Sequence, residues 1–506
     1  PNYDTSITVT EAAIAGEYAL WTGRPHDLYD GAWDGGLWQS TMAATAARAE
    51  IAPYPQWSVM WMYTGDWRMR QMALGMADLA AAFPGQLREG NPAKRLSRAD
   101  PAGTGTGLGH AVSITDRKTL VTAVLGYSYT TAADAPIFVG PVHQLANGGP
   151  WTFDGAHQPS PFYPQYILTG DPWYLNEMYL WAGFTAARYN GADPYDAAGR
   201  GPTGAEGGID DELRGAGWVL RNRAETAFAA PDNDPEKAYF TYLTNDALAR
   251  WEGSLGISGT AYDGTAVKIW GASTGDFYTG NGGPFGNKTP TLGNWESGGN
   301  PNGSDGTAEN NVNGGTFAAN VGSYTSPWMQ WYVQYALGRV EELGFASDAL
   351  RAKAGAFLSG VIDNSGYPKL IGMYEFPVET NYVSNPPGGY PATWAAQVAE
   401  IPMPFLTGNG WNPAGNGGAG DLDQYFAANL FDDGRPIWAM GGLAMMVDHG
   451  DAGAAQAWRW FIPNVYQLIG AGGSLQWDPK WAIVPRADTN TLPAQPTATP
   501  SAAGAT

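Results

Sequence analysis

The sequence YTGDWRMRQMALGMADLAAAF at residues 63–83 contains the turn that decides the fold, and LTGDPWYLNEMYLWAGFTAARY at residues 168–189 repeats its pattern. In both, an apolar helix ends, a glycine makes the turn, and Asp66 or Asp171 is placed to cap the next helix by accepting its free N–H groups. The apolar spacing of the segments that follow predicts amphipathic or buried helices. The repeated phrase therefore predicts helical hairpins.

Weaker forms of this turn occur further along the chain, where Asp246, Asp348 and Asp451 are each predicted to cap another helical segment. Clean runs of alternating strand pattern are missing. Repeated hairpins without strands predict an all-α fold in which each hairpin buries its apolar face against its neighbours. The spacing of the turns leaves room for further hairpins, so both a closed ring and an open solenoid are compatible with it.

A resemblance to a known architecture rests on the same phrase. LTGDPWYL, residues 168–175, at a hairpin turn resembles the (α/α) toroids of glycoside hydrolases and polysaccharide lyases, and the stretch at residues 151–181 looks like uncharacterised bacterial toroid proteins of polysaccharide-degrading type. At the level of overall architecture the resemblance extends over most of the chain. It does not identify a particular family. It implies an (α/α) toroid with a catalytic-type domain over residues 1–488.

The C-terminal segment TNTLPAQPTATPSAAGAT, residues 489–506, is rich in Pro, Thr and Ala. This composition predicts an extended linker or disordered tail. Linkers of this kind tether extracellular modules, which favours a secreted or cell-surface protein with further modules beyond the linker. An ordinary frayed C-terminus is the alternative.

Composition excludes several classes of function. A net charge of −21 and a pI near 4.5 argue against nucleic acid as a partner. The longest apolar runs are too short to span a membrane. The absence of Cys removes disulfides, thiolate metal sites and Cys nucleophiles, and no metal-binding His pair or nucleotide-binding loop occurs. We therefore expect no metal and no cofactor, and chemistry that depends on carboxylates, Tyr and the five His.

The segment DGAHQPSPFYPQY, residues 154–166, is the first candidate for a catalytic site. Asp154, His157 and Tyr163 bring an acid, an imidazole and a phenol to a loop that leads into a helix, where a substrate could reach them. His157 with Tyr163 suits β-elimination, in which one group removes a proton and the other protonates the leaving oxygen. Asp154 could instead protonate a glycosidic oxygen. The structural alternative is that Asp154 and His157 only pin the loop.

Two further carboxylates are catalytic candidates. Asp34 lies in HDLYDGAWDGGLW, residues 26–38, where carboxylates and Trp rings are suited to binding and cleaving a sugar. Helix capping is the competing interpretation for this aspartate. Glu89 follows Arg88 at the start of a polar stretch that could fold over a cleft. We interpret Glu89 as a secondary acid/base group.

Candidate substrate-binding residues are mostly aromatic and lie in loops or at helix starts. The Gly- and Asn-rich stretch 271–322 has little periodic apolar signal, which indicates a functional insertion or lid, and an Asn there could neutralise a uronate carboxylate. For any single Trp, packing in the core is the alternative. The candidates are Trp33, Trp38, Arg88, Trp151, Tyr166, Trp295, Asn311, Tyr324, Trp328 and Trp411.

Three functions remain open, each with a carbohydrate polymer or oligosaccharide as the partner. The excess of carboxylates, the Trp-rich loops and the shortage of His favour a glycoside hydrolase. A polysaccharide lyase would use Tyr163 or Tyr166 with His157 on a uronate glycan. The charge of −21 opposes that substrate, although basic residues between Arg88 and Lys118 could offset it locally. The third option is a non-catalytic glycan-binding surface module.

Overall fold

The computed structural model describes residues 1–24, 36–38, 48–81, 87–96, 106–123, 126–129, 131–135, 137–139, 158–188, 207, 209, 213–254, 324–325, 327–363, 369–374, 376–377, 436–471 and 473–486. This part of the chain is mostly helical with a few very short strands, as the sequence predicts. The linker predicted at residues 489–506 lies outside the described residues. No helix among those described is long and apolar enough to cross a membrane.

Pairs of consecutive helices joined by short turns make up most of the fold. The pairs are α2 (Gln56–Thr64) with α3 (Trp67–Ala81), α4 (Tyr163–Thr169) with α5 (Pro172–Arg188), α7 (Leu213–Ala229) with α8 (Pro235–Ser254), α9 (Pro327–Glu342) with α10 (Asp348–Asp363), and α15 (Ala439–Asp448) with α16 (Ala454–Phe461). The other helical elements are α1 (Glu11–Gly23), η1 (Ala132–Asp134), α11 (Lys369–Tyr374), η4 (Pro436–Trp438), η5 (Ile462–Tyr466), α17 (Gln467–Ala471) and α18 (Ser474–Trp477).

The two strong turn phrases fold as predicted. Gly65 and Gly170 end α2 and α4 in the left-handed conformation, with φ of 62° and 69°, which glycine adopts without steric cost. The Asp66 carboxylate then accepts a hydrogen bond from the backbone N–H of Arg68 at 2.7 Å. Asp171 accepts one from Trp173 at 2.9 Å. Each aspartate therefore caps the helix that follows it.

We expect Asp66→Ala and Asp171→Ala each to lower the free energy of unfolding by about 1 kcal/mol, because each leaves helix N–H groups without an acceptor. Urea denaturation measures this loss. The exposed Asp232, whose ion pair with Lys237 lies on the surface, provides the control: Asp232→Ala should change stability by less than about 0.5 kcal/mol. Equal stability of all three variants would contradict the capping role.

The weaker forms of this turn fold differently. Asp246 lies inside the continuous helix α8 and accepts a hydrogen bond from the Gly207 N–H at 2.7 Å, so its predicted capping role is wrong. The phrase there has Asn245 in place of glycine and does not end the helix. Asp348 is the first residue of α10. Asp451 pairs with Arg351, and Gly453 occupies the position ahead of α16.

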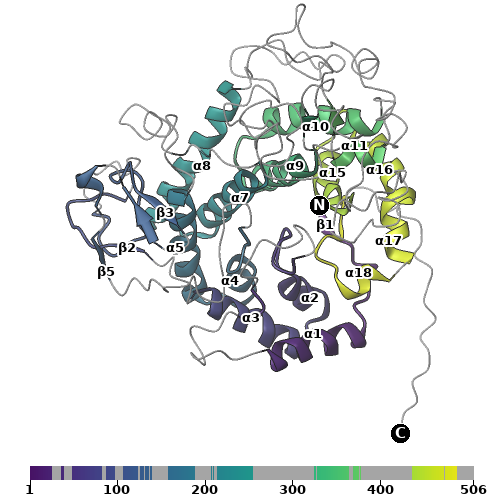
Figure 1. Ribbon diagram of the computed structural model, residues 1–506, viewed down its shortest axis with the longest axis horizontal. Helices are drawn as coiled ribbons and strands as arrows, with labels where there is room; N and C mark the ends of the chain where they lie inside the picture. Colours follow the sequence, from purple (N-terminus) through teal and green to yellow (C-terminus); the bar gives the residue numbers. More distant parts are fainter. Residues whose placement is uncertain are drawn as a thin grey trace, which may run out of the picture.

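Three of the four short antiparallel strand pairs among the described residues join distant parts of the chain. β1 (Asn2–Tyr3) pairs with β8 (Ile483–Val484), and β6 (Tyr324–Thr325) pairs with β7 (Phe376–Pro377). β2 (Arg88–Glu89) pairs with β5 (Phe138–Val139), and β3 (Val121–Ala123) pairs with β4 (Gly126–Ser128). The last four strands belong to a unit that we call the strand lobe, the described residues between 87 and 139. Figure 1 shows this lobe at the left, beside α5 and α8.

Contacts between helices form a continuous series. They lead from α1 through α3, α4, α5, α7, α9, α15, α16, η5 and α17 to α18, which contacts α1 again (Figure 1). At the middle of the series, α7, α9 and α15 pack closely because glycines face their neighbours. A Cβ at Gly217 would lie 3.2 Å from the Tyr332 backbone, and one at Gly442 would lie 3.1 Å from the Trp331 carbonyl oxygen.

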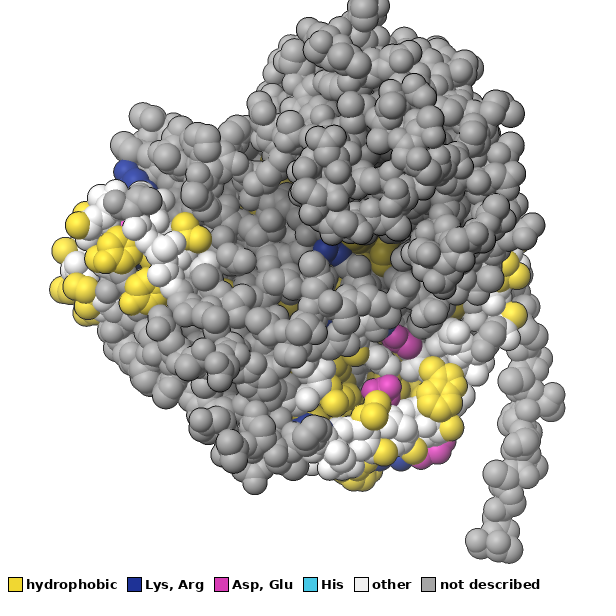
Figure 2. Space-filling view, in the orientation of Figure 1, with side chains coloured by type: hydrophobic (Ala, Val, Ile, Leu, Met, Phe, Trp, Pro, Cys, Tyr) yellow, Lys and Arg dark blue, Asp and Glu magenta, His cyan; other side chains and the backbone are white. Residues whose placement is uncertain are grey.

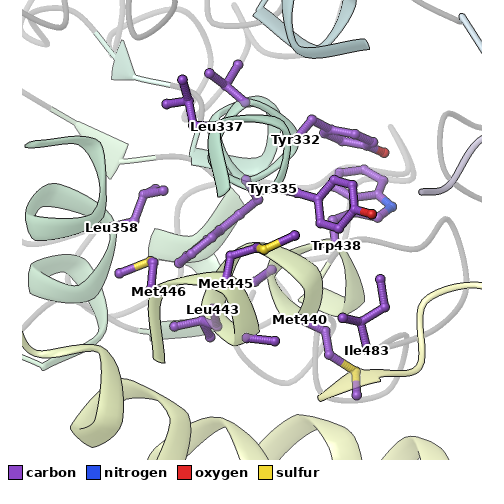
Figure 3. Packing of buried hydrophobic residues seen from close by; sticks show 14 of the residues in the cluster. Tyr332, Tyr335, Leu337, Leu358, Trp438, Met440, Leu443, Met445, Met446 and Ile483 are labelled. Atoms are coloured by element: carbon purple, nitrogen blue, oxygen red, sulfur yellow. The ribbon is translucent and has the colours of Figure 1, made fainter. Parts of the chain in front are cut away.

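Two hydrophobic clusters form the core, and the partly buried Tyr63 and Phe345 pack against both. The larger cluster includes Tyr335 and Leu337 of α9 together with Leu443 and Met445 of α15 (Figure 3). The second cluster joins α3, α4 and α5 to the strand lobe. The core thus fixes α7 and α9 at the centre of the molecule, where the candidate site lies.

Candidate functional site: an interior Tyr-Arg-Glu cluster

Several candidate residues lie outside the described residues: Asp34, Asp154 and His157 among the catalytic candidates, and Trp33, Trp151, Trp295, Asn311 and Trp411 among the substrate-binding ones, together with the side chain of Tyr324. The structure describes the side chains of Trp38, Arg88, Glu89, Tyr163, Tyr166 and Trp328. Of these, Tyr163 lies at the centre of the molecule among charged side chains.

Tyr163, the first residue of α4, contacts helix α9. A guanidinium N–H of Arg339 donates a hydrogen bond to the Tyr163 hydroxyl at 2.9 Å. The Tyr163 ring also stacks on Tyr54, which lies two residues before α2, with ring centroids 5.9 Å apart and planes inclined by 11°. The starts of α2 and α4 therefore meet α9 at one point.

Glu225 of α7 completes this group. It is only 1% exposed, and one of its oxygens accepts a hydrogen bond from the Tyr54 hydroxyl at 2.8 Å. Its other oxygen accepts one from Ser160 at 2.9 Å, and Arg339 Nε lies 3.5 Å from the first oxygen. We call Tyr54, Ser160, Tyr163, Glu225 and Arg339 the Tyr163 cluster. These donors and the cation supply hydrogen-bond partners for both oxygens of the buried side chain.

Helix α7 also holds the segments that lead into α2 and α4. Arg221, which is fully buried, donates to the carbonyl oxygens of Ala52 and Pro53 at 3.1 and 2.9 Å, and to that of Gln158 at 2.9 Å. Asn222 donates to the Pro159 carbonyl at 3.3 Å. These bonds satisfy buried backbone carbonyls that no helix satisfies. They bring Tyr54 and Tyr163 together and place the end of the predicted catalytic segment on α7.

The electrostatic environment keeps the Tyr163 phenol protonated at neutral pH. Burial raises its pKa above the ordinary value, the charge of Glu225 raises it further, and Arg339 lowers it in part. Arg339 is 18% exposed and Tyr54 is partly exposed, so solvent reaches the edge of the cluster. Figure 2 shows basic and hydrophobic side chains in the middle of one face, in the region where Figure 1 places α7 and α9. The cluster can therefore present a proton donor beside a fixed positive charge.

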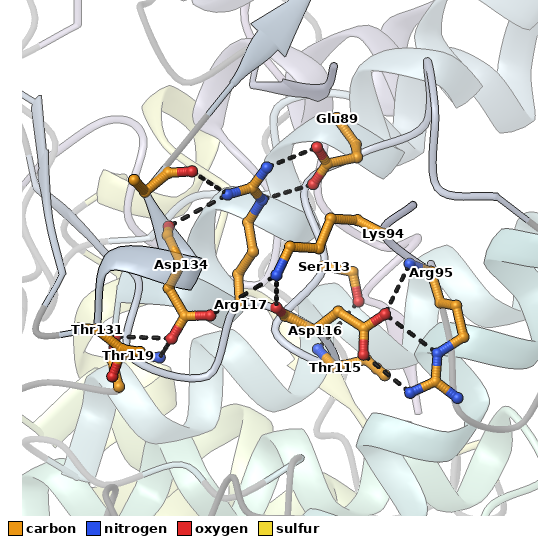
Figure 4. Close-up of polar contacts among 11 residues, drawn as sticks. Glu89, Lys94, Arg95, Ser113, Thr115, Asp116, Arg117, Thr119, Thr131 and Asp134 are labelled. Atoms are coloured by element: carbon orange, nitrogen blue, oxygen red, sulfur yellow. Dashed lines mark hydrogen bonds and ion pairs between the residues drawn. The ribbon is translucent and has the colours of Figure 1, made fainter. Parts of the chain in front are cut away.

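Glu89 lies in the strand lobe rather than at the Tyr163 cluster. Its two oxygens accept hydrogen bonds from Arg117 Nε and from a second guanidinium nitrogen at 2.6 and 2.7 Å (Figure 4). The Asn91 N–H donates a third at 2.8 Å. Arg117 also donates to the carbonyl oxygens of Asp134 and Ala135. Both members of the pair are buried. This arrangement favours a structural role for Glu89 over the acid/base role.

The remaining described candidates have mainly structural surroundings. Arg88 ties the strand lobe to α5 through a hydrogen bond of 2.9 Å to Asn176 Oδ1. Trp38 donates its indole N–H to the Met76 carbonyl, and Trp328 packs against Trp438; both Trp side chains are buried. Tyr166, one turn after Tyr163, is half-buried. Trp38 and Trp328 thus match the core alternative rather than a sugar-binding surface.

The sequence analysis missed Tyr54, Glu225 and Arg339. A signal was present, because RNRAE at residues 221–225 places three charged side chains within five residues, beside the apolar run AGWVL at residues 216–220, and charge in a buried helix is costly unless it is paired. The partner of Glu225 lies 114 residues away along the chain. Spacing in the sequence could not identify it.

Comparison with known proteins supplies no relative: no family model matches the chain, and no curated protein or solved structure does so.

Proposed function

We propose that the chain is an extracellular glycan-cleaving enzyme built as an (α/α) toroid, with the Tyr163 cluster at its catalytic centre. The contact series that returns from α18 to α1 supports a toroid, because it is the series that a closed ring of hairpins would make. The hydrogen bond between Arg339 and Tyr163, beside the buried Glu225, is the observation that carries the functional proposal.

The surroundings of Tyr163 favour β-elimination on a uronate glycan over hydrolysis. In this reaction a base removes the C5 proton, the C4–C5 double bond forms, the C4–O bond breaks, and the leaving oxygen takes a proton from a general acid. Tyr163 is protonated and can supply that proton. Arg339 then stabilises the phenolate that remains and offers positive charge to an anionic substrate. His157 is the candidate base.

Hydrolysis requires two carboxyl groups on opposite sides of the glycosidic bond, one of them free to donate a proton. Glu225 is a poor candidate, since donors occupy both of its oxygens and it is almost fully buried. Glu89 is bound by Arg117. A hydrolase would therefore depend on Asp154 and Asp34, and we treat it as the second outcome of the experiment below.

A screen of neutral and uronate polysaccharides tests the proposal. We expect new reducing ends together with the ultraviolet absorbance of an unsaturated uronate, because β-elimination creates a double bond conjugated with the carboxylate. New reducing ends without that absorbance would identify a hydrolase and overturn the elimination. Binding of a glycan without cleavage of any would identify a binding module and refute the enzymatic proposal altogether.

A further inference from the structure

The strand lobe is attached to the helices mainly by contacts that do not titrate near neutral pH. The Ile114 N–H donates to the Tyr239 hydroxyl of α8 at 3.0 Å, and the Thr122 hydroxyl donates to the Phe184 carbonyl of α5 at 2.8 Å. Arg88 of β2 donates a hydrogen bond to Asn176 of α5, as described above. One contact of the lobe is different because it involves a histidine, which changes charge in this pH range.

That contact joins His110 of the strand lobe to Glu236, the second residue of α8. Nδ1 of His110 lies 2.5 Å from Oε1 of Glu236, whose side chain is only 5% exposed, whereas that of His110 is 34% exposed. The backbone of His110 is part of the lobe, since its carbonyl oxygen accepts a hydrogen bond from the Glu89 N–H at 2.9 Å and its N–H donates to Gly107. A displacement of His110 therefore displaces β2.

The charges around His110 come from two elements, the start of α8 and β2. Glu236 and Asp234, at the start of α8, are acidic, and Asp234 accepts a hydrogen bond from Tyr179 of α5 at 2.7 Å. Arg88 of β2 is the nearby cation. The hydrogen bond to Glu236 raises the pKa of His110, burial opposes this, the charges of Glu236 and Asp234 add to the rise, and Arg88 reduces it. Burial raises the pKa of Glu236, the hydrogen bond and charge of His110 oppose this, and the neighbouring Asp234 adds to the rise.

We propose that His110 and Glu236 form a pH-dependent clamp that holds the strand lobe against α8 when His110 is protonated and weakens when His110 is neutral. The sign follows from linkage. A histidine whose pKa is raised in the folded state contributes its full stabilisation below its unfolded pKa and loses it as pH rises through the folded pKa. Above that point, Glu236 and Asp234 lie side by side without the imidazolium charge. The clamp does not depend on the proposed function.

Hydrogen–deuterium exchange of residues 107–114 tests the clamp in the full-length chain. After correction for the intrinsic rate of exchange, we expect the protection of these amides to fall about tenfold between about pH 6 and about pH 8, as loss of a charged hydrogen bond predicts. Residues 213–229, in α7, serve as the reference. In His110→Gln, protection at residues 107–114 should already be low at the acidic pH and should not change further.

A matched control is His449→Gln. His449 lies at the end of α15, outside the strand lobe, with Nδ1 3.0 Å from Glu341 Oε1, so its loss should leave the pH dependence of residues 107–114 unchanged. Glu236→Gln keeps an acceptor but removes the charge, and should flatten the dependence. An unaltered pH dependence in both His110→Gln and Glu236→Gln, or none in the wild type, would overturn the clamp. An NMR titration of the wild-type protein is a further check, because the pKa of His110 should lie above the ordinary value for histidine.

Discussion

Tyr163→Phe should reduce turnover of a uronate glycan by at least about 100-fold while glycan binding and the fold persist. The substitution removes one hydroxyl and leaves the ring that stacks on Tyr54 in place. If Tyr163 gives its proton to the leaving oxygen, no other described phenol of the Tyr163 cluster can replace it, because the Tyr54 hydroxyl donates to Glu225. Steady-state kinetics and binding of the same glycan measure the two effects separately.

Tyr18→Phe is the matched control. The Tyr18 hydroxyl donates to Gln71 at 2.9 Å on the surface between α1 and α3, so its removal should leave turnover unchanged. Asp154→Asn tests the competing chemistry. If hydrolysis is correct, Asp154→Asn should abolish turnover while binding survives and Tyr163→Phe should keep substantial activity. Under elimination the order is reversed. Full activity in both variants would show that the segment at residues 154–166 is not catalytic.

Local signals in the sequence predicted the helical hairpins because each strong turn contains both the residue that ends one helix and the residue that begins the next. A glycine in the left-handed conformation ends one helix and an aspartate caps the next, as at Gly65 and Asp66. Where the glycine is missing, as before Asp246, the helix continues. The aspartate alone was therefore a poor indicator of a hairpin.

The candidate site could be predicted only in part. Tyr163 was identified because it stands at the start of a helix behind a loop rich in polar residues. Its partners Glu225 and Arg339 lie in the C-terminal halves of helices α7 and α9, and they meet because glycines such as Gly217 let those helices pack closely. Tertiary packing, rather than spacing in the sequence, determines which buried charges become neighbours.

Glu89→Gln should destabilise the strand lobe by about 3 kcal/mol or more and leave turnover per folded molecule unchanged. The amide leaves the fully buried Arg117 without a counter-charge, and an uncompensated buried charge is more costly than the lost hydrogen bonds alone. Native-state hydrogen exchange at residues 107–114, at fixed pH, measures the free energy of opening of the lobe, because the Gly109 N–H donates to the Glu89 carbonyl.

The double variant Glu89→Leu/Arg117→Met distinguishes the loss of the whole ion pair from the loss of one of its two charges. It removes both charges at once, so it should be less destabilised than either single substitution, which would show that the cost comes from a buried charge left alone. An acid/base role for Glu89 predicts the opposite pattern, with turnover reduced by about 100-fold or more and the lobe as stable as in the wild type. That result would move the catalytic centre from the Tyr163 cluster to the strand lobe, since Glu89 belongs to β2 and Tyr163 to α4.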